Sequence, residues 1–119
     1  MARILVVDDA RFMRGMLLQL LESSGHEIVG EAGDGREALD KYRELIPDLV
    51  MMDITMPDVD GIEGIRLIRK EYPDARIIIC SAMGQQNMVV RAIQAGAKDF
   101  IVKPFNPERV ISAIEKVLS

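Results

Sequence analysis

The chain has 119 residues, of which 49% are hydrophobic and 29% are charged, enough apolar material for one domain with its own core. The net charge of -4 offers no general attraction to nucleic acid or to an anionic membrane. A single cysteine, Cys80, excludes a disulfide framework, and no apolar stretch reaches membrane length. We therefore expect a soluble, cytoplasmic protein with no nucleic-acid or membrane partner.

The first half of the chain predicts strands that alternate with helices. Residues 3–8 form an apolar run that predicts a buried strand, and residues 27–32 and 48–53 predict the next two. Between the first two strands, apolar side chains recur at helical spacing, at Met13, Met16, Leu17, Leu20 and Leu21. Gly25 stands where this helix would be capped, and Pro47 blocks continuation of the second helix.

The second half continues the alternation. Residues 76–81 and 99–102 predict the fourth and fifth strands. Gly96 stands at the expected end of the fourth helix. The pair Asn106 and Pro107 is typical of a helix N-cap followed by the first helical residue. The last helix carries an apolar stripe at Val110, Ile111, Ile114, Val117 and Leu118.

Five strand–helix units with short connections predict an α/β fold with a doubly wound, five-stranded parallel sheet. The crossovers should be right-handed, and helices should cover both faces of the sheet. Near-continuous hydrophobicity of the strands agrees with coverage on both faces. No linker or low-complexity segment divides the chain, so we expect a single domain over residues 1–119.

Polar residues follow the carboxyl ends of the predicted strands, which is where ligands bind in open α/β sheets. Asp8 and Asp9 end the first strand, Asp53 the third and Ser81 the fourth, while Lys103 follows the fifth. Three converging carboxylates would form an oxygen-rich site for a hard cation such as Mg2+. Alternatively, strand-end aspartates serve as turn residues or helix N-caps, a strand-end serine hydroxyl bonds to the local backbone, and most lysines are solvated surface residues.

Four segments resemble, in order and spacing, the signature segments of the receiver domain of bacterial response regulators: VVDDARFMR, LVMMDITMPDVDGIEGI, IIICSAMG and AKDFIVKPF. Together they span nearly the whole chain. The resemblance implies the flavodoxin-like (βα)5 fold with strand order 2-1-3-4-5. It also implies a single receiver domain that acts as a phosphorylation-activated switch of a two-component system. Such a protein is not an enzyme, beyond accepting a phosphoryl group and slowly losing it.

The resemblance also assigns a role to each strand-end residue. It implies that Asp53 is the phosphoacceptor. It places Mg2+ on Asp9, Asp53 and the backbone carbonyl of Thr55, with Asp8 acting mainly through water. Lys103 is expected to pair with the transferred phosphoryl group, and Lys103 and the Ser81 hydroxyl together would stabilise charge on the oxygens during transfer.

Two residues are implied in reading out the phosphoryl group. The Ser81 hydroxyl is expected to hydrogen-bond one of its oxygens and to form the conformational switch together with Phe100. From its type and setting alone, Phe100 would more often be a core residue. The family also has a cis peptide at the bond between Lys103 and Pro104, which the sequence alone does not predict.

The resemblance implies a histidine kinase of the chemotaxis type as donor, the flagellar motor switch protein as target, a phosphatase as a further partner, and a monomer. The segment SAMGQQNMVV favours chemotaxis and flagellar rotation, although a phosphorelay intermediate or the receiver half of a transcription factor would share the same site residues. A Mg2+-dependent phosphatase would need an acidic residue two positions after the nucleophile, where Thr55 stands. A flavin carrier would need a phosphate loop after the first strand, where the chain is acidic.

Overall fold

The computed structural model describes residues 1–119 and contains five strands and five helices that alternate along the chain. The strands are β1 (Arg3–Val7), β2 (Glu27–Ala32), β3 (Leu49–Asp53), β4 (Ile77–Ser81) and β5 (Asp99–Val102). The helices are α1 (Arg11–Ser23), α2 (Gly35–Leu45), α3 (Gly61–Glu71), α4 (Gln86–Ala95) and α5 (Pro107–Leu118). All five strands begin within one residue of the predicted positions.

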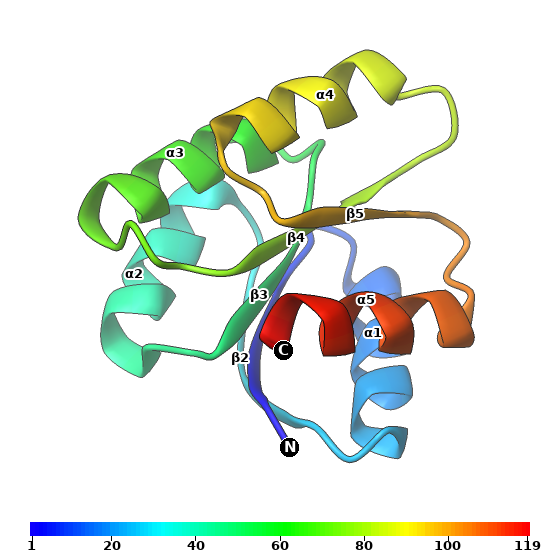
Figure 1. Ribbon diagram of the computed structural model, residues 1–119. Helices are drawn as coiled ribbons and strands as arrows, with labels where there is room; N and C mark the ends of the chain where they lie inside the picture. Colours follow the sequence, from blue (N-terminus) through cyan, green and yellow to red (C-terminus); the bar gives the residue numbers. More distant parts are fainter.

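The strands form one parallel sheet in the order β2-β1-β3-β4-β5, which confirms the predicted topology. Helices α1 and α5 cover one face, and α2, α3 and α4 cover the other (Figure 1). Every residue of β3 and of β4 is buried, because these central strands are covered on both sides. The sheet therefore separates two apolar cores.

Local sequence signals account for several helix ends. Asn106 caps α5 by accepting a hydrogen bond from the backbone N–H of Arg109, and Pro107 is the first helical residue. Gly96 ends α4 with a φ of +121°, a conformation that favours glycine. Both caps were predicted from the sequence.

The stripe predicted for α1 is only partly buried. Leu17 and Leu21 are buried in the core between α1, α5 and the sheet, whereas Met16 is 42% exposed. The contact of α1 with the sheet is therefore narrower than its apolar spacing suggested. None of the five helices combines the length and the hydrophobicity that a membrane span needs.

Candidate functional site

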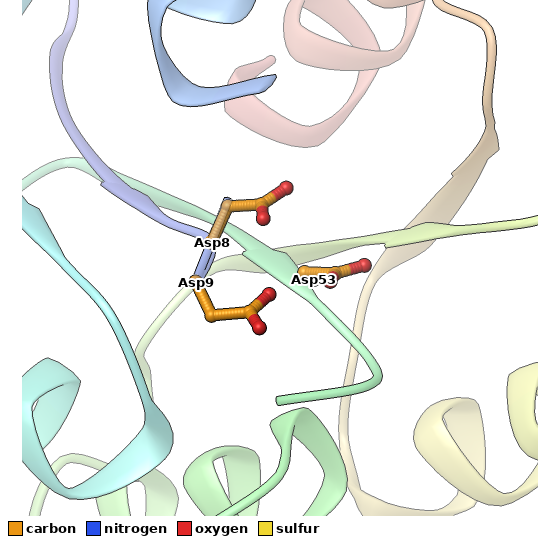
Figure 2. A group of neighbouring side chains, drawn as sticks. All are labelled: Asp8, Asp9 and Asp53. Carbon is orange, nitrogen blue, oxygen red and sulfur yellow. The ribbon is translucent and has the colours of Figure 1, made fainter. Parts of the chain in front are cut away.

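The carboxyl ends of β1 and β3 bring three aspartates together. These two strands are neighbours, with Val7 paired to Met52, so the residues that follow them lie side by side. Figure 2 shows the side chains of Asp8, Asp9 and Asp53 close to one another, with their carboxylates pointing in the same direction. One oxygen from each lies within 4.8 Å of the others. Asp8 and Asp53 are buried and Asp9 is exposed.

The backbone around Asp8 is held on both sides. Its N–H donates to the carbonyl oxygen of Ala32 at 3.0 Å, and its Oδ1 accepts from the N–H of Ala10 at 2.8 Å. The guanidinium of Arg14 donates to the Asp8 carbonyl oxygen and, at 3.1 Å, to a carboxylate oxygen of Glu31. These contacts fix the direction of the Asp8 side chain as the chain turns into α1. No pattern in the sequence indicated this role of Arg14.

Lys103 places a positive charge beside the acidic cluster. Its Nζ lies 3.0 Å from Oδ2 of Asp8 and 3.2 Å from Oδ1 of Asp53, so one ammonium is shared by two buried carboxylates. Its backbone N–H donates to the Ser81 carbonyl oxygen at 2.7 Å, and its peptide bond to Pro104 is cis. The structure thus places Lys103 beside the predicted acceptor from the far side of β4.

Burial and neighbouring charges shift the pKa values of Asp53 and Lys103. Burial raises the pKa of Asp53 from 3.8 to about 6; Lys103 opposes the rise, and the neighbouring carboxylates of Asp8 and Asp9 add to it. Burial alone would lower the pKa of Lys103, but its hydrogen bond to Asp8 and the charge of Asp53 outweigh burial and leave that pKa raised. Lys103 therefore stays charged, while Asp53 is ionised at neutral pH at a cost in free energy.

Ser81 lies at the end of β4, beside this cluster, but does not bond to it. It is 1% exposed, and its Oγ has no hydrogen-bond partner. A buried hydroxyl without a partner costs free energy, and such groups in native proteins often serve a function. The unpaired Ser81 hydroxyl is thus available to a polar group that arrives at the end of β4.

Phe100 lies on β5 at the rim of a cavity of about 450 Å³. The cavity is bounded by Ser81, by the loop that follows it, and by the apolar side chains Val89, Val90 and Val102. Phe100 is 37% exposed, and the guanidinium of Arg109 lies 5.9 Å from the centre of its ring. The aromatic side chain is therefore partly exposed, and Phe100 and Ser81 border the same cavity.

Thr55 lies two residues beyond Asp53 and is exposed. Its Oγ1 accepts a hydrogen bond from Nε2 of Gln85 at 2.7 Å. The sequence predicted a role only for the Thr55 backbone carbonyl and none for Gln85. A glutamine at the start of a helix carries no signal that its side chain reaches a loop thirty residues away.

The donor set of this site fits a hard divalent cation. Carboxylate and carbonyl oxygens are the ligands that Mg2+ prefers in proteins, and the site contains no sulfur or imidazole donor. Asp9 is exposed, so water could complete the coordination shell from the solvent side. The sequence-predicted residues Asp8, Asp9, Asp53 and Lys103 therefore form one acidic pocket, with Ser81 at its edge.

The chain matches the response regulator receiver domain family over residues 4–115. It is 61% identical to the chemotaxis protein CheY of Thermotoga maritima, with 97% of this chain and 96% of the relative covered, and 59% identical to CheY of Bacillus subtilis, with 98% of each covered. A solved complex of CheX and CheY with BeF3 and Mg2+ from Borrelia burgdorferi superimposes with a TM-score of 0.93 at 38% identity, covering 98% of this chain and 89% of that chain.

Proposed function

The chain belongs to the response regulator receiver domain family and is a phosphorylation-activated response regulator of chemotaxis, and we propose that Asp53 is the residue that accepts the phosphoryl group. One observation carries this assignment. Asp53 is the carboxylate of the acidic pocket that ends the central strand β3. Like Asp8 it lies against the Lys103 ammonium, but unlike Asp8 its side chain accepts no backbone hydrogen bond. The proposed receiver domain extends over residues 1–119.

In the proposed reaction, an oxygen of Asp53 attacks the phosphorus atom of a phosphohistidine. A new bond forms between the carboxylate oxygen and phosphorus while the bond between phosphorus and the histidine nitrogen breaks, and the histidine leaves with that electron pair. The product is an acyl phosphate on Asp53. Ionised Asp53 is the nucleophile, which is the form present above its pKa of about 6.

The surrounding side chains stabilise the charge of the transferred group. Lys103 pairs with phosphoryl oxygens from a position already 3.2 Å from Asp53, and Ser81 donates its unpaired hydroxyl to one of them. Asp9, Asp53 and the Thr55 carbonyl would hold Mg2+, with Asp8 acting mainly through water. When bound, this ion supplies positive charge that offsets the negative oxygens during transfer.

The proposed partners follow from the same chemistry. A histidine kinase of the chemotaxis type supplies the phosphoryl group, and a flagellar motor switch protein is the target. A phosphatase is proposed as a third partner, and the CheX–CheY complex among the structural neighbours is an example of a similar protein bound to a second protein. We further propose that the protein is a cytoplasmic monomer, and that it acts as a switch instead of as an enzyme that releases a product.

Intact-mass measurement after incubation with acetyl phosphate and Mg2+ tests the acceptor. We expect one added phosphoryl group on the unsubstituted protein and none on Asp53→Asn. Asp58→Asn is the matched control, because Asp58 is exposed, lies outside the acidic pocket and has a φ of +61°, which asparagine tolerates. Undiminished modification of Asp53→Asn would show that the acceptor assignment is wrong.

A further inference from the structure

Gln85 stands where α4 would be capped, but its side chain makes no hydrogen bond to the helix. Instead, its Oε1 accepts a hydrogen bond from the backbone N–H of Ala82 at 2.7 Å, and its Nε2 donates one to Oγ1 of Thr55 at 2.7 Å. One amide group therefore connects the loop between β4 and α4 to the loop between β3 and α3.

The two anchors of this bridge lie next to residues with proposed roles in the switch. Ala82 follows Ser81, and Thr55 lies two residues beyond Asp53. The N–H of Ala82 needs an acceptor, which fixes the orientation of the Gln85 amide and leaves its NH2 group for Thr55. The bridge thus links the backbone beside the switch serine to the strand end that carries the phosphoacceptor.

Few other contacts hold the loop of residues 82–85 in place. Its Met83 is 80% exposed, and its Gly84 has a φ of +88°. The two hydrogen bonds of Gln85 are the only ones in this loop that involve a side chain. The loop borders the cavity of about 450 Å³ instead of a filled core. A segment with so few packed contacts moves at low cost, so two hydrogen bonds have a large influence on its position.

We propose that Gln85 is a positioning residue of the phosphoryl switch, which ties Ala82 to Thr55 and holds Ser81 in its resting position. The inference rests on the proposed function of Asp53 and Ser81. Movement of Ser81 toward a phosphoryl group carries Ala82 with it, and a displacement of Ala82 relative to Thr55 weakens at least one of the two 2.7 Å hydrogen bonds. The bridge favours the resting arrangement and therefore opposes activation.

The affinity for beryllofluoride, a stand-in for the phosphoryl group, tests this role in saturating Mg2+. Gln85→Ala removes both hydrogen bonds, and Thr55→Val removes only the side-chain acceptor. We expect each variant to bind beryllofluoride about 5-fold more tightly, the equivalent of the ~1 kcal/mol net worth of one hydrogen bond. The double variant should bind no more tightly than Gln85→Ala alone, because both changes break the same bridge.

Gln86→Ala is the matched control, since Gln86 is the next residue, is exposed and makes no side-chain hydrogen bond. It should bind beryllofluoride as the unsubstituted protein does. Unchanged or weaker binding by Gln85→Ala, or additive effects in the double variant, would overturn the proposal. If the proposed function is wrong, the result is different: neither the unsubstituted protein nor Asp53→Asn binds beryllofluoride. The proposed role of Gln85 would then be wrong as well.

Discussion

Polar groups at the amino ends of the strands, here called the amino edge of the sheet, have hydrogen-bond partners. At the carboxyl ends of the strands, the carboxyl edge, some polar groups lack partners or repel one another. At the amino edge, the backbone N–H of Arg3 donates to Oδ2 of Asp48 at 2.8 Å. The Arg3 guanidinium donates to the carbonyl oxygens of Leu45 and Ile46 at the end of α2, both at 2.9 Å. Charged and polar groups at this edge find partners, and the contacts join β1 to the end of α2 and the start of β3.

At the carboxyl edge, three carboxylates lie together, only two of them contact the Lys103 ammonium, and the Ser81 hydroxyl has no partner. Burial of Asp53 among like charges costs free energy, as its raised pKa indicates. The cost is confined to the edge where a cation and a phosphoryl group can offset it on binding. The contacts at the amino edge therefore stabilise the fold, whereas the carboxyl edge keeps groups that destabilise the fold but serve the function.

The largest effect should come from breaking the amino edge. Arg3→Met removes the guanidinium and leaves the carbonyl groups of Leu45 and Ile46 without their partner. We expect a loss of about 2 to 3 kcal/mol in the free energy of unfolding, since hydrogen bonds from charged groups contribute more than neutral ones. Urea unfolding measures it. Arg36→Met, an exposed arginine of α2, should change stability little, and equal losses in both variants would contradict the assigned role of Arg3.

A substitution at the carboxyl edge should increase the free energy of unfolding, whereas Arg3→Met lowers it. Asp53 has a pKa of about 6 in the folded protein against 3.8 ordinarily, so between these values the folded state holds a proton that the unfolded state has released. The free energy of unfolding therefore falls as pH rises from about 4 to about 6. Asp53→Asn cannot titrate, so its stability relative to the unsubstituted protein should grow by about 2 kcal/mol over that range and then stay constant.

Urea unfolding at several pH values, with EDTA to remove metal, measures this difference. Asp58→Asn is the control, because Asp58 is exposed and its removal should leave the pH dependence unchanged. A difference between Asp53→Asn and the unsubstituted protein that is the same at pH 4 and pH 7 would contradict the account of a costly buried charge.

The sequence predicted the fold well because its strongest signals are local or follow from sheet geometry. Continuous apolar runs located the strands, and Asn106 with Pro107 located the start of α5. Parallel strands end at the same edge, which brought Asp8, Asp9 and Asp53 together from positions far apart in the chain. These predictions needed no knowledge of side-chain conformation.

What the sequence could not predict depends on where long side chains reach. Lys103 was predicted to face a phosphoryl group, but its position between Asp8 and Asp53 depends on tertiary packing at the end of β5. The contacts of Arg14 and Gln85 join loops that only the folded chain brings together. Met16 shows the same limit in the core, because helical spacing identifies an apolar stripe but not how much of it is covered.

The smallest effect should come from the exposed member of the acidic cluster. Asp9 contributes to the repulsion around Asp53, but solvent screens its charge. Asp9→Asn should therefore raise the melting temperature without metal by only about 2 °C, and 0.5 M NaCl should reduce this gain.

Mg2+ should reverse the order of stability, because Asp9 is also a proposed ligand. Calorimetry at low salt should find the variant more stable than the unsubstituted protein in EDTA and less stable in excess Mg2+, since binding to the folded state stabilises only the protein that keeps the ligand. The change of sign separates the two contributions of one carboxylate, repulsion without the metal and attraction with it. A variant that is less stable in both conditions would mean that Asp9 supports the fold directly. The carboxyl edge would then stabilise the fold through its polar groups, as the amino edge does.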